Sequence, residues 1–214
     1  EIIDYFLSYT DKKIYLNFLS TSKLYHDQLL SHHSNQYLQR KYKGRKINWF
    51  EVDVEDLDVA KWLHYNKEEG CTQKLMKYAA RHGHLDVVKW IHKNRKEGCA
   101  TKAMDSAAEM GHLDVVIWLH ENRTEGCTTS AMDWAAGNGH LEVVKWLHYN
   151  RKEGCSQIAM EWAAEHGHLE VVKWLHENRK ERCCSQFAMD RTAKNGHLKV
   201  VKFLKSIKRK EEKI

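Results

Sequence analysis

The sequence predicts an all-α fold, a solenoid of similar helical units stacked one after another. One peptide, Gly-His-Leu-Asp/Glu-Val-Val-x-Trp, recurs at a spacing of 28 residues, with a last, more divergent copy after a step of 29. Its copies start at Gly83, Gly111, Gly139, Gly167 and Gly196, and a worn copy spans residues 55–62. Repeats of 20–50 residues indicate units that bury their apolar faces only by stacking. The 214 residues also include no proline, which suits a helical chain because proline interrupts helices.

Each unit is predicted to be two helices joined by a tight turn, as residues 127–154 illustrate. The hydroxyl side chains of residues 128–130 suit the start of the first helix. The apolar face of that helix is made by Ala131, Met132, Ala135 and Ala136. Gly139 ends it in a turn. The wider apolar stripe of the second helix, which stops before Gly154, is made by Leu141, Val143, Val144, Trp146 and Leu147. No stretch alternates with the period of a strand.

These residues resemble the ankyrin repeat. The family's Thr-Pro-Leu-His-x-Ala-Ala-x-x-Gly-His aligns with residues 130–140, and its Val-Val-x-x-Leu-Leu aligns with residues 143–148. The Thr-Pro corner is missing, and the unit is about five residues shorter than the family's 33. The resemblance therefore implies an ankyrin-type solenoid with shortened β-hairpin fingers over residues 51–207, followed by a charged tail at 208–214. The wording Trp-Leu-His-Glu-Asn-Arg-x-Glu-Gly-Cys is similar to ankyrin proteins of giant DNA viruses of amoebae (mimivirus-like) and of some protists.

Residues 1–31 lack the repeat and resemble the F-box, a helical motif that docks on the Skp1 subunit of cullin-type ubiquitin ligases. The match runs through residues 1–3, 6–9, 11–13, 16, 18 and 22–25. The resemblance implies that Skp1-type docking uses Ile2, Ile3, Phe6, Leu7, Leu16 and Phe18. The alternative is a pair of capping helices that cover the first repeat, as a solenoid requires.

Residues 32–50 are predicted to be a basic linker or helix, with Arg40-Lys41-Tyr42-Lys43-Gly44-Arg45-Lys46 ahead of Trp49-Phe50. Such a cluster is one signature of phosphate-backbone binding, but a solvated linker has the same composition, and we do not expect a nucleic-acid partner. No apolar run approaches the roughly 18–20 residues that a membrane span needs, so no membrane partner is expected.

The positions of the histidines and cysteines indicate structural roles rather than metal binding or catalysis. Most of the fifteen histidines fall in two repeated slots, the Gly-His turn and the end of the second helix, without the paired ligands of a zinc site. Five of the six cysteines share one slot in successive repeats, roughly 8–10 Å apart, which is too far for disulfides. We expect reduced, buried thiols and no enzyme activity, metal, cofactor or small-molecule substrate. The doublet Cys183-Cys184, with Arg182 in place of a terminating glycine, predicts a distorted last junction.

The resemblance places a protein target on the concave groove of the solenoid, against residues that flank the Ala-Ala pair. Those positions are Tyr78, Arg81, Ser106, Glu109, Trp134, Gly137, Trp162, Glu165, Arg191 and Lys194, with Gln73, Thr101, Thr129, Gln157 and Gln186 beside them. Trp134 and Trp162 stand where sister repeats carry Tyr, Ser and Arg, so the stack does not dictate them and we predict that they anchor the target. The periodic row Trp62, Trp90, Trp118, Trp146 and Trp174 is expected to be structural.

Together these expectations describe a non-enzymatic adaptor, in which the solenoid holds a protein target and the N-terminal element recruits Skp1 for its ubiquitination. The alternative is a stand-alone ankyrin scaffold or competitor that binds a host or cellular protein without any ligase link. Either role implies an intracellular protein, in the cytoplasm (of the host, if the protein is viral) or in the nucleus.

Overall fold

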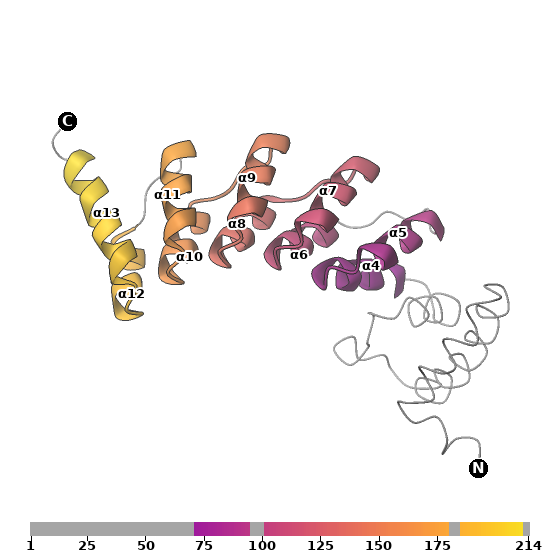
Figure 1. Cartoon of the computed structure of the whole chain (residues 1–214), viewed down its shortest axis with the longest axis horizontal. Helices are drawn as coiled ribbons and strands as arrows, with labels where there is room; N and C mark the ends of the chain where they lie inside the picture. The colour runs from indigo at the N-terminus through magenta and orange to yellow at the C-terminus, as the bar shows by residue number, and fades with distance from the viewer. Residues whose placement is uncertain (1–70, 95–100, 180–184, 212–214) are drawn as a thin grey trace, which may run out of the picture. The chain divides into compact units, whose positions relative to one another are not determined.

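The computed structural model describes residues 71–94, 101–179 and 185–211, which all lie in one compact unit, Lys67–Ile214. These residues form ten helices and no strand, arranged as five pairs (Figure 1). The first helix of each pair, here called the inner helix, is α4 (Cys71–Arg81), α6 (Lys102–Glu109), α8 (Thr129–Gly137), α10 (Ile158–Glu165) or α12 (Gln186–Lys194). The second, outer helix is α5 (Leu85–Asn94), α7 (Leu113–Asn122), α9 (Leu141–Asn150), α11 (Leu169–Asn178) or α13 (Leu198–Glu211). The predicted all-α repeat solenoid is confirmed.

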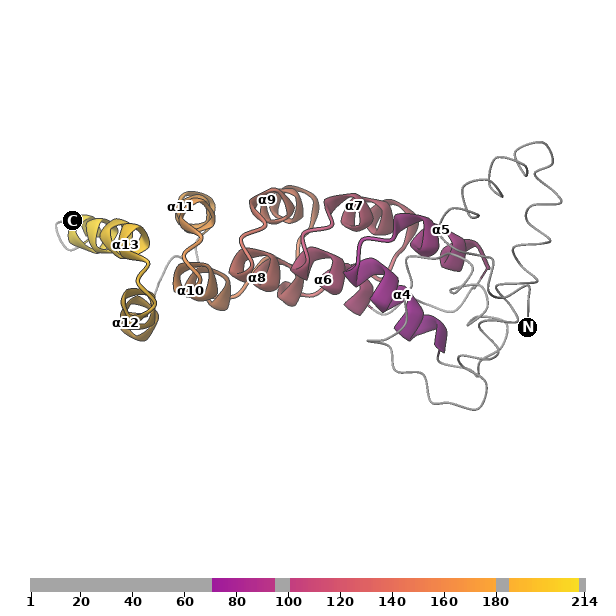
Figure 2. The ribbon, with the colours of Figure 1, turned by 60° about the horizontal axis from the view of Figure 1, so that its bottom comes forward.

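The core lies between two layers of helices, and Figure 2 shows α6, α8, α10 and α12 in one layer with α7, α9, α11 and α13 in the other. Each inner helix packs on the next and on its own outer helix. The predicted apolar positions of the first helix, residues 131, 132, 135 and 136, are fully buried, as are Val143, Val144 and Leu147 of the second. The paired alanines let neighbouring inner helices approach closely, since they carry no bulk between the backbones.

The Gly-His turns join successive repeats. Gly139 has a φ of +81°, a left-handed conformation that glycine adopts without steric cost. A Cβ built there would lie 2.5 Å from Nδ1 of His168, the turn histidine of the next repeat. The same relation holds for Gly83 with His112 and for Gly111 with His140. The Gly-His dipeptide therefore recurs because each histidine ring fills the space that the glycine of the previous repeat leaves open.

The outer helices end at an asparagine that caps them from its side chain. Nδ2 of Asn122 donates to the carbonyl oxygen of Trp118 (2.9 Å), and the asparagines that end α5, α9 and α11 repeat this bond. The backbone then becomes extended at residues such as Arg151 and turns at Gly154, with a φ of +72° and no strand. The β-hairpin finger is thus reduced to a turn. In α13 the position of this asparagine is occupied by Ile207, and the helix continues to Glu211, past the predicted end of the repeats at residue 207.

Several sequence predictions fall outside the described residues: the F-box-like element with its docking residues, the basic linker, the worn repeat at 55–62, and the junction at Arg182 and Cys183-Cys184. The division into residues 1–31, 32–50, 51–207 and 208–214 stays a prediction. Of the ten described helices, none combines the length and apolar character needed to cross a membrane.

Candidate functional site

The predicted binding residues lie along one face of the inner helices. Positions i, i+4 and i+7 share a helix face, so each inner helix offers three successive slots. The first slot holds Lys74, Lys102, Ser130, Ile158 or Phe187. The second holds Tyr78, Ser106, Trp134, Trp162 or Arg191. The third holds Arg81, Glu109, Gly137, Glu165 or Lys194. These fifteen residues are called the inner-helix face below.

Exposure separates the predicted residues into three groups. Trp162, Arg191 and Lys194 are exposed, and half-buried side chains are found at Tyr78, Arg81, Glu109, Trp134 and Glu165. Ser106 is only 1% exposed, so it does not present its side chain to a partner as predicted. Its short side chain stays within the packed helix layer, whereas an indole in the same slot projects beyond it. Gly137 is also buried, and a Cβ there would lie 3.1 Å from Cβ of Trp162, so its role is to seat that indole.

Two cross-repeat ion pairs hold charged residues of this face in place. Nη1 of Arg81 lies 2.6 Å from Oε2 of Glu109, and Nη2 of Arg191 lies 2.6 Å from Oε1 of Glu165. The guanidinium carbon of Arg191 also lies 5.3 Å from the centre of the Phe187 ring, within the range of a cation–π contact. Partly exposed pairs contribute little stability, so their main effect is to orient the side chains.

Side chains just after the third slot tie adjacent inner helices through the backbone. Nδ2 of Asn138 donates to the carbonyl oxygen of Glu109 (2.8 Å), and Nδ2 of Asn195 donates to that of Glu165 (3.0 Å). The backbone under the inner-helix face is therefore fixed before any partner binds. A fixed surface loses less conformational entropy on binding than a mobile one.

An exposed apolar cluster lies at the C-terminal half of the face. Ile158 is 42% exposed, Trp162 is 37% exposed and Phe187 is 67% exposed. Ile158 and Trp162 are four residues apart on α10, and Phe187 is on the adjacent α12. The sequence prediction included Trp162 but missed Ile158 and Phe187. A comparison of the first slot among the repeats could have found both residues, because that slot is polar at Lys74, Lys102 and Ser130 and apolar only in the last two repeats.

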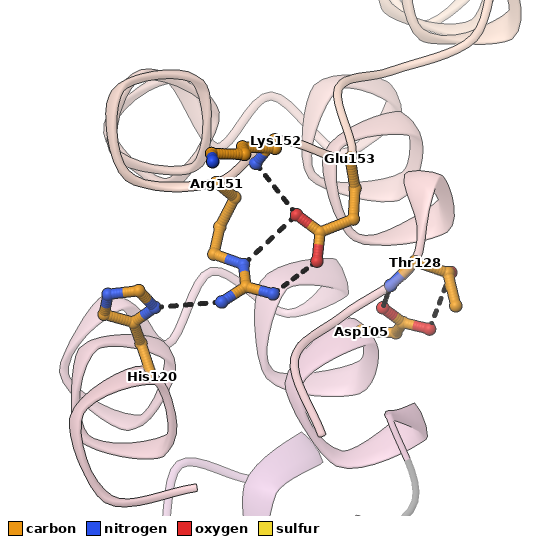
Figure 3. A network of polar contacts seen from close by, with 6 residues as sticks. All are labelled: Asp105, His120, Thr128, Arg151, Lys152 and Glu153. Atoms are coloured by element: carbon orange, nitrogen blue, oxygen red, sulfur yellow. Dashed lines mark hydrogen bonds and ion pairs between the residues drawn. The ribbon is translucent and has the colours of Figure 1, made fainter. Parts of the chain in front are cut away.

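Below this face, carboxylates of α6, α8 and α10 accept hydrogen bonds from the start of the next repeat. Asp105 accepts bonds from N and Oγ1 of Thr128, both at 2.8 Å (Figure 3), and Asp133 accepts the same pair from Ser156. Burial raises the pKa of both carboxyl groups, and the bonds from Thr128 and Ser156 partly offset that rise. Glu161 takes the place of the aspartate in α10, and the backbone N–H of Ser185 donates to it at 3.4 Å.

On the opposite side, an arginine links the outer helices of neighbouring repeats. Arg151 donates to Glu153 and to Nδ1 of His120, which lies 3.2 Å away in the previous repeat (Figure 3). The His120 and Trp146 rings are also nearly perpendicular, with their centres 5.1 Å apart. Because an arginine only donates, Nδ1 of His120 is the acceptor in this contact. The histidines and tryptophans of the second helix are therefore structural, as predicted.

This linkage recurs in the stack and then stops. Arg123 contacts His92 and Arg179 contacts His148 in the same way, and the pKa of His148 is lowered by burial and then by the charge of Arg179. His176 has no such partner, and its buried Nδ1 forms no hydrogen bond. The position equivalent to Arg151 and Arg179 is Lys208, which is exposed and lies within α13 rather than in a turn. The orphaned nitrogen marks the end of the regular stack.

Burial makes Cys127 and Cys155 poor candidates for nucleophilic chemistry. Burial raises the pKa of Cys127 to about 11, so this thiol is a poor nucleophile at neutral pH. Cys127 and Cys155 are both buried and unbridged, in agreement with the sequence prediction. Among residues 71–94, 101–179 and 185–211, no group of three or more His, Cys, Asp and Glu side chains is placed to hold a metal ion.

Comparison with protein-family models identifies the repeats. A model described as ankyrin repeats (3 copies) matches residues 132–213, and one described as ankyrin repeats (many copies) matches residues 76–120 and 104–148. Together the matches span residues 76–213, more than half of the chain. The chain belongs to the ankyrin-repeat family. A search of curated proteins found no match.

Ankyrin repeats indicate a protein–protein interaction module, and members of the family typically act as non-enzymatic binding scaffolds. The family assignment confirms the resemblance stated for the 28-residue units. The similarity to giant-virus proteins and the F-box resemblance of residues 1–31 are not covered by these matches and stay predictions.

Proposed function

We propose that this ankyrin protein is an adaptor that holds a protein target on its inner-helix face and recruits Skp1 of a cullin-type ubiquitin ligase through residues 1–31. The observation that carries target binding is the cluster of Ile158, Trp162 and Phe187, exposed on neighbouring inner helices. Single exposed apolar residues are common on protein surfaces, but adjacent ones on a fixed backbone are typical of interfaces. Both proposed partners place the protein in the cytoplasm or nucleus of a cell.

The arrangement around Trp162 supports its role as an anchor. Tryptophan, tyrosine and arginine dominate interface hot spots, and the second slot carries all three types. Trp162 rests on Gly137, so the backbone of α8 supports one side of the indole while the other side remains available. Trp134 is half-buried in the preceding repeat and extends the aromatic surface toward α8.

The target-binding half is tested with the double variant W134A/W162A. Cross-linking and affinity purification from cell extract identify candidate targets of the wild-type protein, and titration calorimetry then measures the affinity of each purified target. Loss of the anchor should weaken binding by about 2–4 kcal/mol, while thermal stability changes little. If the melting temperature drops sharply and target affinity is unchanged, the two tryptophans are core residues and the anchor lies elsewhere.

The ligase half is tested with purified Skp1 and the double variant F6D/L7D. The resemblance of residues 1–31 to the F-box predicts micromolar or tighter binding by the wild-type chain and none by the variant, with an unchanged helical signal in circular dichroism. If the wild-type chain does not bind Skp1, or if the variant unfolds the repeats, residues 1–31 are a cap. The protein would then be a stand-alone scaffold or competitor, with its target-binding half intact.

A further inference from the structure

The first slot of the inner-helix face changes character along the stack. It is cationic at Lys74 and Lys102, neutral at Ser130, and apolar at Ile158 and Phe187. Both lysines are exposed. The five positions are equivalent in the repeat, and all are exposed except the half-buried Ser130, so core packing does not explain the gradient. The inner-helix face therefore presents positive charge at its N-terminal half and apolar surface at its C-terminal half.

The positive charge at the N-terminal half is not neutralised within the inner helices. Helix α4 contains no acidic residue and adds a further exposed lysine, Lys77. Helix α6 has two carboxylates, and both are engaged: Asp105 accepts bonds from Thr128, and Glu109 pairs with Arg81. Lys74 and Lys102 thus remain available to an external carboxylate, which is the complementary charge.

The C-terminal half provides the apolar anchor site. Ile158 and Trp162 share a face of α10, and Phe187 lies on α12 with the Arg191 guanidinium over its ring. Because Arg191 is also paired with Glu165, its charge is largely satisfied and it frames the cluster. An aliphatic or aromatic side chain of a partner would cover the exposed parts of these three side chains, and removing that apolar surface from water favours binding.

We propose that the inner-helix face recognises an extended segment of a partner protein that carries acidic residues at one end and an apolar anchor about five or six residues away. The spacing follows from geometry: packed helices lie roughly 8–10 Å apart, so α6 and α10 are separated by two such steps, and an extended chain advances about 3.3 Å per residue. The acidic end lies over α4 and α6, and the anchor lies over α10 and α12. This inference rests on the proposed target-binding function and specifies its partner.

The observations favour a protein segment over a nucleic acid. A nucleic-acid backbone carries negative charge along its whole length and would need cations along the whole face. The first slot instead loses its positive charge at Ser130 and becomes apolar beyond it. An acidic and apolar peptide matches both halves.

The test selects peptides on the full chain from a phage library of random sequences about 12 residues long, enough to span the face at about 3.3 Å per residue. The two variants to compare are K74S/K102S and I158S/F187S. Serine is the residue that the stack itself uses in this slot at Ser130, so both variants should keep the wild-type melting temperature. Affinities of the selected synthetic peptide for each variant are measured by fluorescence anisotropy.

The proposal expects enriched peptides that combine Asp or Glu with an apolar residue five or six positions away. Their affinity should fall about tenfold or more in each variant, with K74S/K102S also removing most of the salt dependence. Enriched apolar peptides that ignore K74S/K102S, or a control peptide with shortened spacing that binds equally well, would overturn the proposal and leave the binding function standing. If nothing is enriched on the wild type over I158S/F187S, the target-binding function itself fails.

Discussion

Replacing Gly139 by alanine should expose how the turn histidines lock successive repeats. The glycine has a φ of +81°, and a side chain in this left-handed conformation costs about 1–2 kcal/mol. Its new Cβ would also lie 2.5 Å from Nδ1, 2.7 Å from Cε1 and 2.9 Å from Cγ of the His168 ring. All three distances are shorter than van der Waals contact, and the ring is held within the stack, so overpacking should add about 1–3 kcal/mol. We therefore expect a total loss of about 2–5 kcal/mol in unfolding free energy.

The chain contains a matched control at Gly196, whose φ is +80° but whose added Cβ would meet nothing within 4 Å. G196A should lose only the conformational part, about 1–2 kcal/mol. A second control, G139A combined with H168A, removes the clashing ring, so its loss should be smaller than the sum of the two single losses. Urea unfolding followed by circular dichroism measures the wild type, G139A, G196A, H168A and the double variant. Equal losses for G139A and G196A, or strict additivity in the double variant, would refute the interlocking of glycine and histidine.

Two further predictions concern histidines. H176L should leave the free energy of unfolding unchanged or raise it by up to about 1 kcal/mol, because it removes a buried nitrogen that has no hydrogen-bond partner. H120L breaks the contact with Arg151 and should lower the free energy of unfolding by about 1–3 kcal/mol. Equal effects of the two variants in thermal melts would contradict this prediction. Burial lowers the pKa of His140, His148 and His168 from the ordinary value of 6.5, so the unfolded chain binds more protons and stability should fall as the pH drops below about 6.5. Urea midpoints from about pH 8 to pH 5 check the sign, and a midpoint that rises on acidification would be inconsistent with neutral, buried histidines.

Much of the repeat could be predicted from residues 127–154 alone, because its signals are local. Thr128 does cap α8, with its hydroxyl accepting from the backbone N–H of Ser130, and Gly139 does take the left-handed turn. The inner-helix face was less predictable. Sequence position assigns Ser106 and Trp162 the same slot, but whether a side chain emerges from a packed layer depends on its length, and only the indole is long enough.

Contacts between repeats could not be predicted from local patterns, since their partners are far apart in sequence. The histidine that ends each second helix was recognised as structural, but its arginine partner lies 31 residues later, in the turn of the next repeat. The recurrence of both residues at fixed positions was the signal that would have found the pair. The orphaned nitrogen of His176 agrees with the same rule, because Lys208 takes the place of the arginine at the last step and lies within α13 instead of in a turn.

Comparison of equivalent positions among the repeats distinguishes residues that packing of the stack requires from residues that it does not require. Slots that hold the stack together keep one type of residue with a partner in the next repeat, as the glycines of the Gly-His turns do at Gly83, Gly111, Gly139 and Gly167. The first slot of the inner helices is different, since lysine and serine occupy it in three repeats and keep it polar. Phe187 is 67% exposed in that slot, so most of its apolar area does not gain the roughly 25 cal/mol for each Å² that burial provides. The stack therefore has no need of an aromatic side chain there, and the same fold accepts a polar one at Lys102. The exposed apolar residues at Ile158 and Phe187 are therefore explained by a partner outside the stack better than by the packing within it.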